Sequence, residues 1–170
     1  MNEQDQEATT AFVPLRRVVT GHDEQGRSTV WLDGAASNQR EPADRLRTTL
    51  MWLTGAAPDY LRDEDAGLHR TGIAPPAAGS RFSVLQIAPG NEVAGLHRTD
   101  SIDYAICLQG PLQMVLDTGE TTLQTGDVVI QRGTNHAWRN RSDTVAVLAV
   151  VLVDAWPKRA DSISGEQMAH

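Results

Sequence analysis

The chain has 170 residues, of which 40% are hydrophobic and 22% are charged, and its formal net charge is -7. This length fits one domain with a substantial core and is too short for two ordinary domains. The acidic balance argues against nucleic acid or an anionic membrane surface as the main partner, since either would favour a basic patch.

Targeting signals and cysteine content limit the cellular compartments that the sequence fits. The chain has no run of about 18 apolar residues, and residues 1–7 are acidic where a secretory signal would be basic and then apolar. We therefore expect a cytoplasmic protein without a membrane partner. The single cysteine, Cys107, excludes an internal disulfide and a zinc site built from several thiolates. We expect Cys107 to fill space in the core rather than act as a nucleophile, because no histidine neighbours it in sequence.

The N-terminal part reads as a tail followed by short strands. Residues 1–11 are polar and charged, which predicts a disordered tail. Residues 16–20 and 27–33 predict two strands around a glycine-framed turn at 21–26. Residues 34–44 are rich in Gly, Ala, Ser, Asn and Pro, and they predict a loop.

The middle of the chain alternates strand and irregular structure. Residues 48–54 favour a strand over the end of a helix, because Thr and Trp lead the segment and a glycine follows it. Residues 55–80 contain several prolines and glycines and predict a long irregular excursion, either a lid over a binding site or a plain surface wrap. Residues 81–87 predict the next strand.

Beyond residue 110 the pattern is regular. Short strands with glycine-containing turns between them are predicted at 112–116, 121–123 and 128–131. Their spacing is typical of an all-β sandwich or barrel. Residues 145–153 lack alternation and predict a strand buried on both faces. We expect one domain over 12–157, with its core barrel at about 80–154 and a flexible tail at 158–170.

The residues able to carry chemistry gather between positions 90 and 140. If the first half of this stretch is extended, one face carries His97, Thr99, Ser101 and Asp103, because successive strand side chains alternate. In the second half, the residues of shared parity are His136, Trp138 and Asn140. The pattern places an imidazole and a carboxylate on one side of a strand.

The two glycine-framed halves resemble the paired motifs of the cupin superfamily over roughly residues 80–154. The first motif of that family has a glycine, His-x-His, a glutamate and a closing glycine, and the matching residues are His97, Asp103 and Gly110. The second has Gly-Asp, Pro-x-Gly, His and Asn, and the matching residues are Gly126, Asp127, Gly133, His136 and Asn140. The chain departs from the family pattern where Thr99 replaces the second histidine and Gln131 replaces the proline. The interval from Gly90 to His97 is also one residue longer than usual.

This resemblance implies an all-β, cupin-type jelly-roll barrel with His97, Asp103 and His136 converging in its mouth. Two imidazoles and a carboxylate with open positions suit a divalent metal ion, with Fe(II) favoured and Mn, Ni or Zn possible. The expected lining of the substrate pocket comprises Thr99, Ser101, Cys107, Trp138 and Asn140. Asp103 and His136 are the expected catalytic residues.

Three classes of function remain open, because a fold alone does not decide function. The first is a metal-dependent, oxygenase-type enzyme for a small oxygenated organic substrate. The second is a non-redox lyase, dehydratase or isomerase in which the metal is a Lewis acid and Asp103 or His136 moves a proton. The third is a ligand-binding or structural cupin without turnover, which Thr99 in place of a histidine favours. In that case the histidines satisfy buried carbonyls and Asp103 neutralises a nearby arginine.

The side chains that point outward from the same predicted strand indicate an oligomer. Tyr104, Ile106 and Leu108 form a second apolar face opposite the candidate site. We expect this face to be buried in a homodimer, since cupins commonly pair through an outer sheet.

Overall fold

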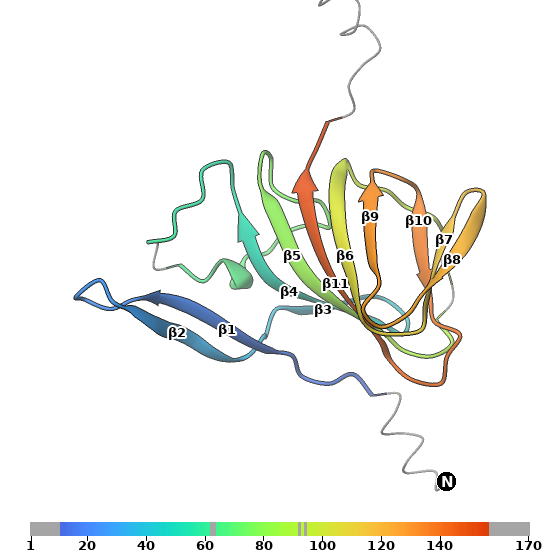
Figure 1. Ribbon diagram of the computed structural model, residues 1–170, viewed down its shortest axis with the longest axis horizontal. Helices are drawn as coiled ribbons and strands as arrows, with labels where there is room; N and C mark the ends of the chain where they lie inside the picture. Colours follow the sequence, from blue (N-terminus) through green and yellow to red (C-terminus); the bar gives the residue numbers. More distant parts are fainter. Residues whose placement is uncertain (1–10, 62–63, 92, 94, 157–170) are drawn as a thin grey trace, which may run out of the picture.

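The computed structural model describes residues 11–61, 64–91, 93 and 95–156 (Figure 1). The predicted tails fall outside these residues, except for Ala11. In the described part, every regular element is a strand apart from one short 3-10 helix, η1 (Ala66–Leu68). None of its helices has the length and apolar character needed to cross a membrane.

The strands follow the chain in two groups. The N-terminal strands are β1 (Arg16–His22), β2 (Ser28–Ala35), β3 (Gln39–Ala43), β4 (Leu46–Thr54) and β5 (Ser80–Ile87). The C-terminal strands are β6 (Ser101–Gln109), β7 (Leu112–Leu116), β8 (Gly119–Leu123), β9 (Val128–Arg132), β10 (His136–Arg139) and β11 (Ala146–Asp154). The predicted strands at 48–54, 81–87, 112–116, 121–123 and 128–131 are confirmed.

Two sheets form the barrel. The larger has the order β3-β4-β5-β11-β6-β9, and the smaller has the order β10-β7-β8. They curve towards each other, while β1 and β2 project to one side as a separate hairpin arm (Figure 1). Residues of both sheets meet in one hydrophobic core, including Ile87 and Leu148 from the larger sheet and Leu112 and Leu123 from the smaller. The predicted all-β jelly-roll barrel is therefore confirmed.

Strand β6 alternates strictly between the interior and the surface. Its inward residues Asp103, Ala105 and Cys107 are buried, whereas the intervening side chains are exposed. Cys107 packs in the core next to residues of β11, as expected for a space-filling thiol. The period of two thus fixes which face of β6 points into the barrel.

Strand β11 occupies the middle of the larger sheet between β5 and β6. Leu148 and Val150 face the barrel core. Ala149 faces outward and packs in a second buried cluster with Met51, while Leu15 covers that cluster. The centre of β11 is therefore buried on both faces, as its unbroken apolar sequence predicted.

The loop predicted at 34–44 is wrong in part. Strand β2 continues to Ala35, and β3 pairs antiparallel with β4 through Gln39 and Arg40. All residues of β3 are exposed, so the strand has no apolar alternation to reveal it in the sequence. It lies at the edge of its sheet, where Pro42 is tolerated because an edge strand can lack a backbone donor.

Candidate functional site

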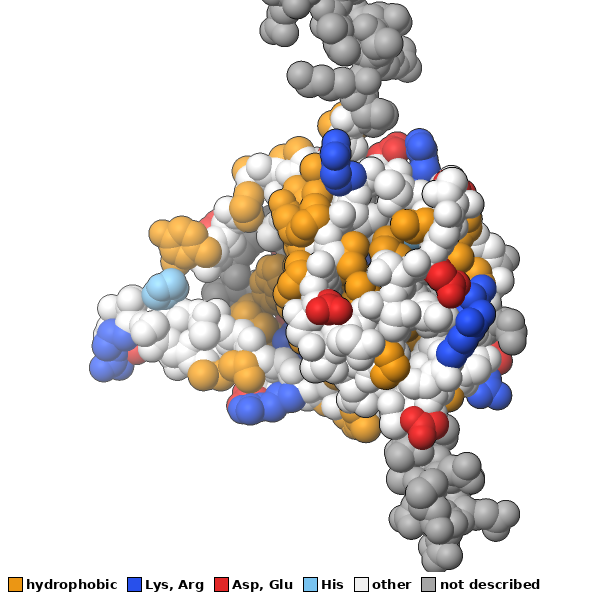
Figure 2. Space-filling view, turned by 45° about the vertical axis from the view of Figure 1, so that its right-hand side comes forward, with side chains coloured by type: hydrophobic (Ala, Val, Ile, Leu, Met, Phe, Trp, Pro, Cys, Tyr) orange, Lys and Arg blue, Asp and Glu red, His pale blue; other side chains and the backbone are white. Residues whose placement is uncertain are grey.

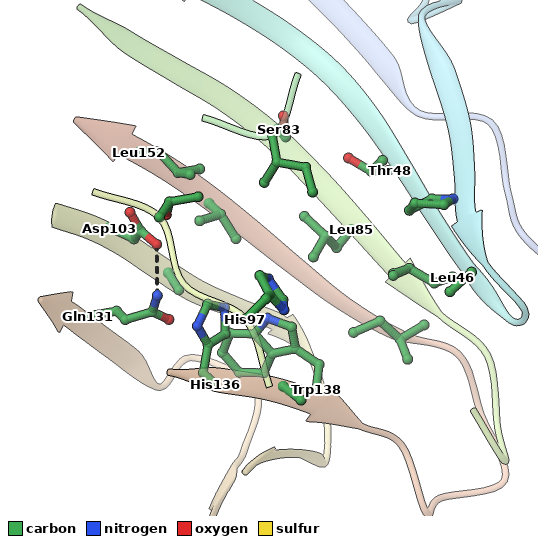
Figure 3. Close-up of a pocket in the computed structure, with 18 of the residues that line it drawn as sticks. Leu46, Thr48, Ser83, Leu85, His97, Asp103, Gln131, His136, Trp138 and Leu152 are labelled. Atoms are coloured by element: carbon green, nitrogen blue, oxygen red, sulfur yellow. Dashed lines mark hydrogen bonds between the residues drawn. The ribbon is translucent and has the colours of Figure 1, made fainter. Parts of the chain in front are cut away.

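The barrel encloses a cavity of about 280 Å³ lined by residues of both sheets. Most of its walls are aliphatic or aromatic, and they include Leu46, Leu85, Ile87, Ala105, Trp138, Val150 and Leu152 (Figure 3). Two groups stand out among its polar side chains. One contains His97, Thr99, Asp103, Gln131 and His136, and the other contains Thr48, Arg81 and Ser83; Asp44 and Asn91 also line the cavity. A mostly apolar pocket with a few directed polar groups is typical of sites for small organic molecules.

His97 and His136 are brought together by the backbone. His97 precedes β6 and forms an isolated antiparallel bridge with His136, the first residue of β10. Each backbone N–H donates to the carbonyl of the other residue, at 3.0 and 2.9 Å. The centroids of the two imidazole rings lie 4.4 Å apart, with the ring planes tilted by 49°. His97 is exposed and His136 is buried, so the pair leads from the surface into the cavity.

The surroundings of His136 favour a neutral imidazole with one free nitrogen. Its Nδ1 lies 3.1 Å from the carbonyl of Thr134, which can only accept, so Nδ1 carries the hydrogen. Burial lowers the pKa of His136, and the nearby His97 lowers it further, while the hydrogen bond to Thr134 opposes both effects. Nε2 is therefore the nitrogen that can bind a metal or accept a proton.

Asp103 is 4% exposed and both of its carboxylate oxygens accept hydrogen bonds. Ser101 Oγ donates to Oδ1 at 2.5 Å, and Gln131 Nε2 donates to Oδ2 at 3.0 Å (Figure 3). Burial raises the pKa of Asp103, against the hydrogen bond from Ser101 and the charge of His97. Because Ser101 donates to Asp103, it accepts from the hydroxyl of Thr99 at 2.6 Å. Thr99 lines the cavity, so two hydroxyl groups connect the cavity to the buried carboxyl group.

The raised pKa of Asp103 predicts a pH-dependent cost of folding. An acid whose pKa is higher in the folded state binds its proton more tightly there, so stability falls as the pH rises from the unfolded-state pKa through the folded-state pKa. Asp103→Asn should remove this fall and make the metal-free protein more stable than the wild type near neutral pH, with the gain vanishing in acid. Urea unfolding between pH 4 and pH 8 with a chelator present measures the difference.

The control for that experiment is Asp143→Asn, which changes an exposed carboxyl group. Its stability should run parallel to that of the wild type over the same pH range. If Asp103→Asn also runs parallel, burial of Asp103 carries no titration-linked cost and its assigned environment is wrong.

Three residues predicted to line the pocket lie elsewhere. Ser101 is buried and donates to Asp103, Cys107 lies in the core, and Asn140 follows the end of β10. Asn140 is fully buried, and its Nδ2 donates to the carbonyls of Ile87 and Thr144, each at 2.7 Å. Parity assigns Ser101 and Cys107 to the inner face of β6 but does not say how far along the strand the cavity extends, and Asn140 lies beyond the end of β10. Thr99 and Trp138 do line the cavity.

Several polar residues of the cavity are not identified by the sequence pattern, and Gln131 and Arg81 are the two with the clearest partners. Gln131, which stands where the family has proline, pairs directly with Asp103 across β6 and β9. Arg81 opens the predicted strand at 81–87, and its side chain is buried. A charged residue with inward parity in an otherwise apolar strand is the signal that would have identified it.

The irregular segment between β4 and β5 contributes to the cavity. Ile73 lies in its lining, and Arg81 donates a hydrogen bond to the carbonyl of Gly72. The segment therefore forms part of the cavity wall and is not only a connection across the surface.

The residues of the site fit a metal ion chemically through the imidazole pair. Ligating histidines usually donate their other ring N–H to a backbone carbonyl or carboxylate, as His136 does to Thr134. Each oxygen of Asp103 accepts one hydrogen bond and keeps a further lone pair. The predicted set of His97, Asp103 and His136 is not arranged as a three-ligand metal site, because no group of three His, Cys, Asp or Glu in the described part is placed to hold a metal.

Comparisons with known proteins agree with this architecture. The Cupin domain family matches residues 83–153. "Phomopsin biosynthesis cluster protein C'" of Diaporthe leptostromiformis is 34% identical over 169 residues, which cover 93% of this chain and 87% of that protein. "Cupin-domain-containing oxidoreductase fogC" of Aspergillus ruber is 31% identical over 135 residues, covering 73% of this chain and 63% of that protein.

Among solved structures, the Cnp3 cupin domain of Schizosaccharomyces pombe superposes with a TM-score of 0.49 at 12% identity. The match covers 82% of this chain and 87% of that one. On the family match and the extended similarity to the Diaporthe protein, the chain belongs to the cupin superfamily.

Proposed function

We propose that this cupin is an oxidoreductase that acts on a small organic molecule held in the barrel cavity, with the reaction taking place at His97 and His136. The observation that carries the proposal is the imidazole pair, whose ring centroids lie 4.4 Å apart in the wall of a mostly apolar cavity. The Aspergillus relative is named a cupin-domain-containing oxidoreductase, which supports the same class.

The proposed cofactor is a divalent metal ion held by His97 and His136. Asp103, predicted from the sequence as the third ligand, is not arranged with the two histidines as a ligand set among the described residues. Fe(II) is the favoured ion, and Mn, Ni or Zn are also accepted by imidazole donors. When bound, such an ion supplies electron transfer or polarisation of a substrate oxygen. The protein contributes a neutral His136, whose orientation is fixed by the hydrogen bond to Thr134.

The hydroxyl groups beside Asp103 provide a route for a proton. A substrate proton passes to Thr99 Oγ1 as the Thr99 hydroxyl proton moves to Ser101 and the Ser101 proton moves to Asp103 Oδ1. The raised pKa of Asp103 suits this group to hold the proton until it returns. Gln131 fixes the other oxygen, and Trp138 packs edge-on against His136, which excludes water from this side of the ring.

A second candidate is a non-redox lyase, dehydratase or isomerase. Burial raises the pKa of Asp103 and lowers that of His136, so the cavity favours proton uptake by the carboxyl group and proton release by the imidazole, relative to the free side chains. Opposed shifts of this kind are typical of an acid and base that act in sequence.

Oxygen consumption with a panel of small oxygenated aromatic and aliphatic compounds tests the proposal. We expect substrate-dependent oxygen uptake that a chelator abolishes and Fe(II) restores. Product formation without oxygen uptake would instead support the proton-transfer candidate. If compounds bind in the cavity but none is converted under either condition, the protein is a binding cupin and both enzymatic readings fail.

The outer face of β6 and β9 is the proposed dimer interface. Large hydrophobic side chains are exposed along both strands: Ile102, Tyr104, Ile106, Leu108, Val128 and Ile130. Figure 2 shows hydrophobic side chains gathered in patches on the barrel surface. Contiguous exposed apolar patches often mark interaction sites, and a second copy supplies a matching patch through twofold symmetry.

Ile106→Lys combined with Ile130→Lys should convert the dimer into a monomer, because each copy would place charges in an apolar interface. Sedimentation equilibrium should give twice the 18.5 kDa chain mass for the wild type and the chain mass itself for the variant. Leu68→Lys, which changes an exposed leucine in η1, should leave the dimer intact. A monomeric wild type at about 100 μM would contradict the interface.

A further inference from the structure

Arg81 places a buried positive charge in the wall of the cavity. It is 7% exposed and lies on β5, where it pairs with Leu152 of β11. Leu152 in turn pairs with Asp103 of β6, and residues directly opposite one another share a face of the sheet. Arg81 and Asp103 therefore stand in one row on the inner face, two strands or about 10 Å apart at the backbone.

The hydrogen-bond partners of Arg81 do not neutralise its charge. Nε donates to Ser83 Oγ at 3.0 Å, and Nη1 donates to the carbonyl of Gly72. Among the residues that the structure describes, no carboxylate lies within ion-pair distance of Arg81, and Nη2 has no recorded acceptor. Its charged neighbour is Arg40, whose like charge adds to the effect of burial in lowering the pKa of Arg81. A buried cation without a counterion is costly unless an anion joins it.

Two hydroxyl groups accompany the guanidinium group. Because Ser83 Oγ accepts from Arg81, its own O–H remains able to donate. Thr48 lines the cavity beside it, on β4. Figure 3 shows Ser83 and Thr48 at one end of the cavity and His97 and His136 at the other, with Leu85 between them. The end that contains Arg81 thus offers a cation and neutral donors in an otherwise apolar space.

We propose that the substrate is a small organic carboxylate whose anionic group binds Arg81 and Ser83. Guanidinium groups bind planar carboxylates through paired, charge-assisted hydrogen bonds. The apolar body of the molecule packs along Leu85, Val150 and Leu152, and this presents the far end of the molecule to the histidine pair. The inference rests on the proposed function, since it names the class of substrate for the same cavity.

Binding of matched carboxylates and amides to the wild-type protein is the first test. Isothermal titration calorimetry on chelator-treated protein compares cinnamate with cinnamamide and hexanoate with hexanamide. At least one carboxylate should bind about tenfold or more tightly than its amide, since only the anion neutralises Arg81. A panel in which no carboxylate binds more tightly than its amide overturns the proposal. So does inorganic phosphate binding as tightly as the carboxylates, because phosphate has no apolar body.

Variants of Arg81 form the second test. Arg81→Met retains the length of the side chain and should abolish the preference for the carboxylate, whereas Arg81→Lys should retain part of it. Arg16→Met, which removes an exposed guanidinium group from the hairpin arm, should bind as the wild type does. A folded Arg81→Met that keeps the full preference overturns the proposal. If Arg81→Met does not fold, the wild-type comparison and Arg81→Lys decide.

These measurements require no turnover and no metal. Failure of the carboxylate proposal therefore appears as lost anion preference in an otherwise active protein. Failure of the proposed oxidoreductase function appears as absent turnover in a protein that still prefers the carboxylate.

Discussion

Asn140→Ala is expected to lower the free energy of unfolding by about 3 to 5 kcal/mol, because it removes hydrogen-bond partners from several buried polar groups. The Asn140 side chain donates to the carbonyls of Ile87 and Thr144 and accepts from the backbone and hydroxyl of Ser142. Its own backbone N–H donates to Asn91 Oδ1 at 2.6 Å. Removing the amide takes this donor from the buried carbonyl of Ile87 and leaves the carbonyl of Thr144 with the Ser142 hydroxyl alone, while the Ser142 backbone N–H loses its acceptor. Chemical denaturation of wild type and variant measures the loss.

The matched control is Asn135→Ala. Asn135 is exposed and its amide donates to the carboxylate of Asp117, also at the surface. The cost of this substitution should stay within about 0.5 kcal/mol, as is usual at exposed positions. Equal losses at the two positions would show that Asn140 does not join β5 to the loop before β11.

His136→Ala should reduce the metal retained by the purified protein to less than about a tenth of the wild-type amount. Loss of an outer-shell partner alone typically lowers metal affinity 10- to 100-fold, so the loss of a ligand should lower it by about 100-fold or more. Elemental analysis of protein purified without added metal measures retention, and calorimetric titration with Zn(II) measures affinity.

The chain offers a matched histidine as control. The sequence Gly-Leu-His-Arg-Thr occurs at residues 67–71 and again at 95–99, so His69 has the same local sequence as His97. His69 Nε2 lies 2.8 Å from Glu64 Oε1, and the residue is not part of the barrel cavity lining. His69→Ala should therefore retain metal as the wild type does. Equal loss in His69→Ala and His136→Ala would place the metal elsewhere.

Much of the fold could be predicted because its periodicity is local. The alternation in β6 identified its inner face, and the unbroken apolar sequence of β11 identified a strand between two covered faces. Strand β3 was missed because it is exposed throughout and gains its structure from pairing with β4, which no local pattern reports.

The candidate site could be predicted only in part, for a related reason. Glycine framing and parity pointed to His97, Asp103 and His136, and the structure lines the cavity with all three. Parity gives the face of a residue but not its register against other strands. The contact of Asp103 with Gln131 and the row that links Asp103 to Arg81 depend on register, so they emerge only from the assembled sheet.

Anomalous scattering from crystals soaked in Co(II) tests the central claim most directly. We expect one strong peak inside the barrel, about 2.0 to 2.3 Å from Nε2 of His136 and from a ring nitrogen of His97. A barrel cavity without a peak, or a peak bound only by surface carboxylates, would contradict the assignment of this histidine pair as the reactive centre.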